Sequence, residues 1–138
     1  MRPMPSIVLD NQLSLAIPSI DREHREMVAL LNQLHDAISA GAPRSILSNA
    51  LGQLIQSTKN HFAHEEYLFE QTTYPDAEAH RLEHVNTSAW LAEVRRKYDE
   101  GISGISLETV DYLKDWFFDH ILGSDRQYST FLRAAGIR

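Results

Sequence analysis

The sequence feature that most constrains the fold is the stretch HFAHEEYLFEQTTYPDAEAHRLEH, residues 61–84. It places His61 and Glu65 four residues apart, then a helix break at a proline, and then His80 and His84 four residues apart. Because four residues turn an α-helix roughly 40° past a full circle, each pair projects from one face, about one turn apart. The stretch therefore predicts two helices that each present a pair of side chains with chelating spacing.

The residue types in these pairs indicate which metals they would bind. Imidazole nitrogen together with carboxylate oxygen suits iron, zinc or manganese. The chain has no cysteine, so a thiolate site, a disulfide scaffold and a thiol nucleophile are all excluded. One histidine pair would be weak support for a metal site, whereas two pairs close in sequence and separated by a helix break are considerably stronger.

Length and charge restrict the remaining possibilities. With 138 residues, 43% of them hydrophobic, the chain predicts a single domain spanning residues 1–138. The formal net charge of -6 argues against binding to nucleic acid, which needs clustered basic side chains. The apolar pieces near the amino terminus are short and interrupted by prolines, so we expect no signal peptide, no membrane span and a cytoplasmic protein.

Hydrophobic periodicity predicts an all-α chain with four amphipathic helices. Short loops between them favour an up-down-up-down antiparallel four-helix bundle. We expect Ser19 or Asp21 to cap the first helix. The predicted segments are an extended, proline-containing arm at residues 1–18, helices at about 19–40, 44–71, 76–100 and 106–122, and a short carboxyl-terminal segment at 123–138.

The polar residues on the apolar seams are placed alternately near the start and the end of successive helices. In an antiparallel bundle, alternate starts and ends lie at the same end of the core. Buried together without a metal, these imidazoles and carboxylates would each cost several kcal/mol, whereas histidines on the surface would have no reason to align in this way. The predicted metal site consists of His24, His61, Glu65, His80, His84, His120 and Asp125.

Asp125 fits this set only if the helix departs from regular geometry. A step of five residues from His120 turns an α-helix about 140° away from it. The helix must therefore end, tighten or bulge between the two residues, and Gly123 makes such a departure easy. The remaining histidines have other expected places: His35 in the core or at its boundary, and His64 at a helix interface or in solvent.

Taken together, the motifs DREH, HFAHEE, HRLEH and HILGSD resemble a known family. In this order they are similar to the hemerythrin signature of an isolated histidine, HFxxEE, HxxxH and HxxxxD. The resemblance covers about residues 17–128. It implies a non-heme di-iron protein, not an enzyme, that binds dioxygen reversibly at a five-coordinate iron for oxygen storage, delivery or sensing. The sequence leaves open whether the protein has a protein partner.

The resemblance also implies a role for each residue of the predicted site. His80, His84 and His120 would bind one iron, and His24 and His61 the other. Glu65 and Asp125 would bridge the two ions together with an oxo or hydroxo ligand. The inward-facing side chains next to the open position, which are candidates for an oxygen pocket or for ordinary core packing, are Met27, Val28 and Phe117.

The sequence departs from the family pattern at two places and leaves two other functions open. Leu9 and Asp10 occupy a region of the arm where a tryptophan is common in the family, and Phe69 stands where a methionine is common. One alternative function is a di-iron enzyme acting on peroxide, nitric oxide or ferrous iron. A second is a structural bundle in which a metal supports folding and zinc would serve as well as iron. The nitrogen-rich ligand set favours reversible binding over oxidation chemistry.

Overall fold

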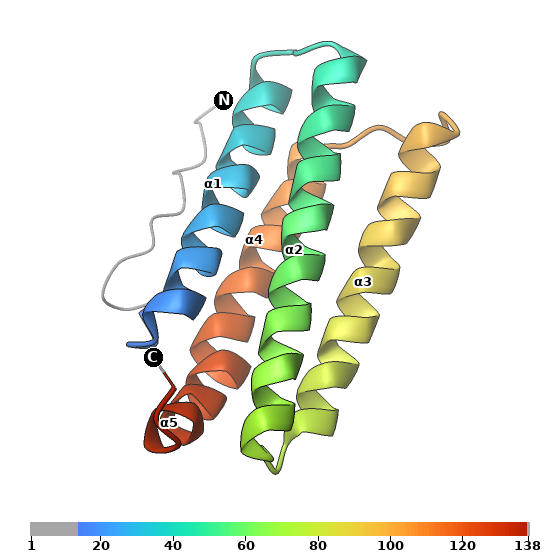
Figure 1. The fold of residues 1–138 in the computed structure, drawn as a ribbon. Coiled ribbons are helices and arrows are strands. Elements are labelled where there is room, and N and C mark those ends of the chain that lie inside the picture. The colour runs from blue at the N-terminus through green and yellow to red at the C-terminus, as the bar shows by residue number, and fades with distance from the viewer. Residues whose placement is uncertain (1–13, 138) are drawn as a thin grey trace.

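The computed structural model describes residues 14–137, and these residues form only helices and the segments that join them (Figure 1). Four long helices make up the body of the molecule, and a π-helical turn and a short helix follow them. The all-α bundle predicted from the sequence is therefore confirmed. In chain order the elements are α1 (Pro18–Ser39), α2 (Arg44–Thr72), α3 (Ala77–Asp99), α4 (Leu107–His120), η1 (Ile121–Asp125) and α5 (Arg126–Ala134).

The helices alternate in direction, as short connections require. α1 packs against both α2 and α4, and α2 also packs against α3. One end of the bundle, the lower end in Figure 1, therefore brings together the start of α1, the end of α2, the start of α3 and the end of α4. α5 lies at this same end. Side chains near those four helix ends consequently lie at one depth in the core.

The start of α1 differs from the expectation. The arm predicted for residues 1–18 falls mostly outside the described residues, and its last residue, Pro18, is the first residue of α1. Proline suits that position because its fixed φ is helical and it has no N–H to satisfy. Ile17 is the N-cap and makes no side-chain capping bond, so the predicted cap by Ser19 or Asp21 is wrong.

Asp21 instead holds the segment that precedes α1. Its buried carboxylate accepts hydrogen bonds from the Leu15 backbone N–H at 2.9 Å and from the Ser14 hydroxyl at 2.8 Å. Leu15 and Ile17 are buried in the same core as the helices. Tertiary packing of this segment, and not a local cap, therefore fixes where α1 begins.

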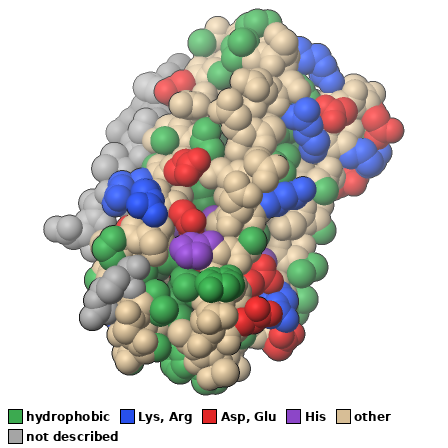
Figure 2. All heavy atoms as spheres, viewed as in Figure 1, with side chains coloured by type: hydrophobic (Ala, Val, Ile, Leu, Met, Phe, Trp, Pro, Cys, Tyr) green, Lys and Arg blue, Asp and Glu red, His purple; other side chains and the backbone are tan. Residues whose placement is uncertain are grey.

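The core is divided along its length by polarity. Away from the lower end it is built from leucines and other apolar side chains, among them Leu31, Leu34, Leu51, Leu54 and Leu91. None of the described helices combines the length and the hydropathy that crossing a bilayer requires. On the face drawn in Figure 2, basic side chains lie among acidic ones and form no continuous basic patch.

Candidate metal centre

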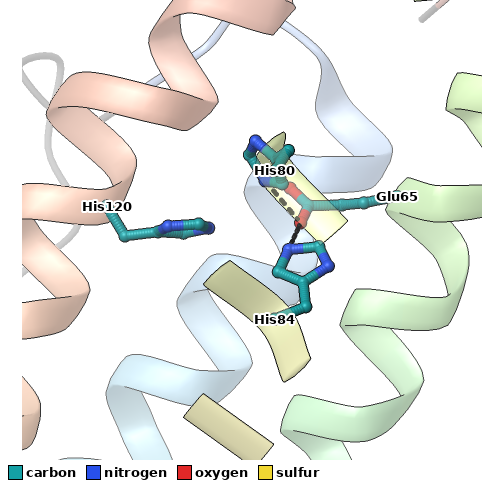
Figure 3. Close-up of side chains that lie close together, drawn as sticks. All are labelled: Glu65, His80, His84 and His120. Carbon is teal, nitrogen blue, oxygen red and sulfur yellow. Dashed lines mark ion pairs between the residues drawn. The ribbon is translucent and has the colours of Figure 1, made fainter. Parts of the chain in front are cut away.

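The seven side chains predicted from the sequence converge at the lower end of the core. α1 supplies His24, α2 supplies His61 and Glu65, and α4 and η1 supply His120 and Asp125. His80 and His84 come from α3. Figure 3 shows three of these histidines around the Glu65 carboxylate. All seven side chains are buried, and Glu65 and Asp125 have no exposed surface.

Three of the histidines form one group, which we call the three-histidine group: His80, His84 and His120. Glu65 Oε1 lies 2.9 Å from His84 Nε2 and 3.5 Å from His80 Nε2. Asp125 Oδ1 lies 3.0 Å from His120 Nε2 and 3.1 Å from His80 Nε2. This group therefore faces one oxygen of each carboxylate.

His24 and His61 form the two-histidine group on the other side of the same carboxylates. Asp125 Oδ2 lies 3.1 Å from His24 Nε2, and Glu65 Oε2 lies 3.3 Å from His61 Nε2. The Nε2 atoms of His24 and His61 are 3.2 Å apart. Each carboxylate thus directs one oxygen to each histidine group, which is the arrangement that a bridging ligand requires.

A π-helical turn brings Asp125 to this position. η1 covers Ile121–Asp125 and directly follows α4, which ends at His120. A π-helix bonds each residue to the one five positions along, so residues five apart lie over one another. Asp125 therefore sits on the same side as His120, and the departure from regular helix that the sequence requires takes the form of a bulge.

The buried polar atoms of the site fit metal ions better than they fit one another. Despite the short separations given above, none of the Nε2 atoms of the three-histidine group has a partner in hydrogen-bond geometry among the described residues, and neither do Glu65 Oε1 or either oxygen of Asp125. Such atoms are costly in a dry core unless a ligand satisfies them. Within each of two overlapping sets, all ligand atoms lie within 4.8 Å of one another; the sets are Glu65, His80, His84 and His120, and His24, His61, Glu65 and Asp125.

The electrostatics of the site favour positive charge beside the Glu65 carboxylate. Burial lowers the pKa of His61, but the charge of Glu65 and the hydrogen bond to Glu23 outweigh it and raise that pKa to about 10. Burial also lowers the pKa of His80, and contacts with Asp125 and Glu65 raise it to about 9. Burial raises the pKa of Glu65, yet the neighbouring imidazoles bring it well below its usual value. Protons on the imidazoles or metal cations can supply this charge.

Further contacts around the site were not predicted from the sequence. Glu23 Oε1 lies 2.8 Å from His61 Nδ1, and Glu83 Oε2 lies 2.9 Å from His120 Nδ1. The Tyr128 hydroxyl on α5 donates to Glu65 Oε2. An outer carboxylate of this kind fixes the orientation and tautomer of a ligand imidazole. The sequence positions of these two glutamates could have indicated the contacts, because Glu23 lies in the first turns of α1 and Glu83 lies one turn from His80.

The histidines outside the predicted set have other partners. His35 is buried, with Nδ1 3.7 Å from an oxygen of Asp36. His64 is half-buried, and its Nδ1 lies 2.9 Å from Glu23 Oε1, the same oxygen that contacts His61. A histidine side chain is visible beside acidic side chains in Figure 2.

A small apolar cavity lies in the core next to the site, and its lining contacts both histidine groups: Phe117 meets His24, and Trp116 stacks on His120. Met27 and Phe117 line it, and the Phe117 ring meets the His24 ring edge-on at 5.7 Å between centroids. Its volume is about 20 Å³, and roughly 10–15 Å³ by this measure holds one water-sized molecule. Thr58 and Thr87 also line it, but their hydroxyls donate to backbone carbonyls of their own helices. Val28 is buried and does not line this cavity.

Comparison with known proteins agrees with this geometry. Residues 15–132 match the family described as the hemerythrin HHE cation binding domain. The chain belongs to the hemerythrin family. It is 33% identical to bacteriohemerythrin of Stenotrophomonas maltophilia over 131 residues, which cover 95% of this chain and 84% of that protein. It is 29% identical to myohemerythrin-1 of Phascolopsis gouldii over 122 residues, which cover 88% and 90% of the two chains.

Solved hemerythrin structures have the same fold. A leucine-to-alanine variant of hemerythrin superposes with a TM-score of 0.89 at 26% identity and covers 94% of this chain and 98% of its own. A wild-type hemerythrin superposes with a TM-score of 0.81 at 28% identity and covers 84% and 88% of the two chains. The bundle and the cation-binding domain of this chain are therefore those of the hemerythrin family.

Proposed function

We propose that this hemerythrin-family protein holds two iron ions and binds dioxygen reversibly at one of them. His80, His84 and His120 would hold one ion, and His24 and His61 the other. Glu65 and Asp125 would bridge both. The observation that carries this proposal is the way each buried carboxylate divides its two oxygens between the histidine groups.

The unequal number of histidines supports binding of a further ligand on one side only. Three imidazoles, two carboxylate oxygens and a bridging oxo or hydroxo ligand fill the six positions that iron commonly uses. The two-histidine group supplies one ligand fewer, so its metal would keep an open position. An iron pair supplies the two electrons that dioxygen takes up on binding and returns on release.

The protein surroundings of the two-histidine group suit a small apolar ligand. Phe117 contacts His24, and with Met27 it lines the cavity described above, so we propose both as residues of the oxygen pocket. Val28 is a weaker candidate, because it lies in the core outside the cavity lining. The apolar walls would exclude water from the open position of a metal held by this group.

An oxygen and vacuum cycle tests this function directly. Purified protein is loaded with ferrous iron without air, exposed to oxygen and then evacuated, while the visible charge-transfer band is followed. Appearance and reversible loss of the band over repeated cycles would support oxygen carriage. Irreversible oxidation or steady turnover of oxygen would contradict it and favour an enzyme.

The same cycle also separates oxygen binding from a purely structural role. A bundle in which the metal only supports folding would bind zinc and iron equally well and show no oxygen-dependent band. Zinc-loaded protein is the control for the folding contribution of the metal. We expect zinc to stabilise the bundle against thermal unfolding and only the iron form to respond to oxygen.

A further inference from the structure

Two aromatic side chains stack face to face on imidazoles of the three-histidine group, and they differ in chemistry. Phe62 is buried and stacks on His84, with ring centroids 3.8 Å apart and planes 9° apart. Trp116 is half-buried and stacks on His120 at 4.6 Å and 13°. A phenyl ring resists oxidation, whereas the indole of tryptophan gives up an electron readily. Of these two stacks, only the Trp116 stack therefore offers a path for electrons.

Trp116 leads from the site to a surface groove between α3 and α4. Trp90, Tyr112 and Trp116 all line this groove. Tyr112 and Trp116 are four residues apart on α4, so their side chains lie on one face about one turn apart. The Tyr112 and Trp90 rings are 5.1 Å apart, and 58% of the Tyr112 surface is exposed. Oxidisable rings thus extend from a buried imidazole to solvent.

The absence of cysteine suggests what such an electron path would do for the protein. Without cysteine, the protein has no thiol to absorb an oxidising equivalent produced at the site. Met27 is buried and lines the same cavity as Trp116 and Phe117. Oxidation of its thioether to the sulfoxide would place a polar group in the apolar pocket. A route that carries oxidising equivalents outward would protect Met27.

We propose that Tyr112, with the Trp90 ring beside it, and Trp116 form an electron-transfer route that reduces the metal site when it reacts with hydrogen peroxide, so that oxidation ends at the protein surface. The proposal rests on the iron pair of the proposed function. Hydrogen peroxide takes up two electrons and two protons and becomes two waters. The electrons leave Tyr112 one at a time and reach the site through Trp116 and the stacked ring of His120.

Each electron that leaves Tyr112 is accompanied by its phenolic proton, which passes to solvent and balances a proton consumed with the peroxide. The product is a neutral tyrosyl radical at the surface. A small one-electron reductant such as ascorbate then returns one hydrogen atom to each radical. The iron pair ends in the oxidation state in which it began, and two reductant molecules are oxidised for each peroxide.

Two variants distinguish electron transfer through Trp116 from a role in which Trp116 only orients the His120 ring. Trp116→Phe keeps a flat ring against His120 but replaces indole by a group that resists oxidation. Tyr112→Phe removes the exposed phenol and leaves the stack intact. The matched control is Tyr67→Phe on α2, because Tyr67 is 57% exposed, lies outside the groove and so differs from Tyr112 mainly in position.

The test mixes iron-loaded protein with hydrogen peroxide, freezes it rapidly and records the electron paramagnetic resonance spectrum; the Met27 sulfoxide is then measured by mass spectrometry. We expect a tyrosyl radical in the parent protein and in Tyr67→Phe, and its loss in Tyr112→Phe. Trp116→Phe should lower the radical yield and raise the Met27 sulfoxide several-fold. Zinc-loaded protein should give no radical.

Other outcomes would overturn the route. An unchanged radical in Tyr112→Phe, or the same sulfoxide yield in Trp116→Phe and the parent protein, would show that the stack only orients His120. Iron content is measured before peroxide is added, and variants are compared at equal iron. A parent chain that takes up no iron would overturn the proposed function as well, whereas full iron content without a radical that depends on Tyr112 would overturn the route alone.

Discussion

The two histidine groups share both carboxylates but differ in ligand number and in surroundings. The three-histidine group is flanked by the stacked rings of Phe62 and Trp116. The two-histidine group has one imidazole fewer, and among the described residues no ring stacks face to face on His24, which the Phe117 ring meets edge-on. The difference teaches that one shared pair of carboxylates can face two unequal sets of imidazoles, which is what the proposed saturated and open metal positions require.

The largest effect is expected from Glu65→Ala, because it removes an oxygen from both groups at once. We expect the variant to lose nearly all iron from both the three-histidine and the two-histidine group, so that the two groups no longer differ. Metal analysis after anaerobic loading measures this. Glu70→Ala is the matched control, since Glu70 lies on the same helix and is exposed. Equal iron in the two variants would contradict a bridging role for Glu65.

His61→Ala should disrupt the two-histidine group and leave the three-histidine group intact. We expect the iron of the three-histidine group to remain, the oxygen-dependent band to disappear and most helical structure to persist in the circular dichroism spectrum. His64→Ala, on the same helix, should keep the band, because His64 contacts Glu23 and not the ligand cluster. An unchanged band and iron content in His61→Ala would remove that residue from the site.

The outer carboxylates sharpen the comparison, because each supports a different group. Glu83→Ala removes the partner of His120, and Glu23→Ala removes the partner of His61. Loss of such a partner typically weakens metal binding by roughly 10- to 100-fold. We expect Glu83→Ala to weaken the iron of the three-histidine group and Glu23→Ala the other iron, in a competition with a chelator. The opposite pattern would reverse the assignment of the groups.

The smallest effect concerns the pocket alone. Phe117→Leu keeps an apolar side chain but removes the ring that contacts His24. Iron content should stay the same, while the rate of oxygen release changes a few-fold as measured by stopped-flow mixing. A matching change in Leu34→Val, which alters the core away from the site, would show that Phe117 acts only through general packing.

Much of the fold was predictable because it follows from periodicity. Apolar spacing identified the four helices, and the alternation of histidines between helix starts and ends predicted a polar cluster at one end of the core. The five-residue step from His120 to Asp125 required a departure from regular helix, and the structure has a π-helical turn there. The kind of departure was not predictable, because an early end, a tighter turn and a bulge all satisfied the same spacing.

The contacts around the candidate ligands were not predictable for a different reason. Glu23, Glu83 and Tyr128 reach the site only because of how the helices are rotated about their axes and where α5 folds back. Amphipathic spacing places a residue on a face but does not say which partner it meets across an interface. The start of α1 was likewise decided by packing of Leu15 and Ile17 in the core and not by a local cap.

Anaerobic titration of the metal-free protein with ferrous iron tests the central claim most directly. If Glu65 and Asp125 each serve both histidine groups, the chain should take up two ions, and a spin-coupled pair should appear on oxidation. Saturation at a single ion, or two ions that behave as isolated centres, would contradict a shared carboxylate pair.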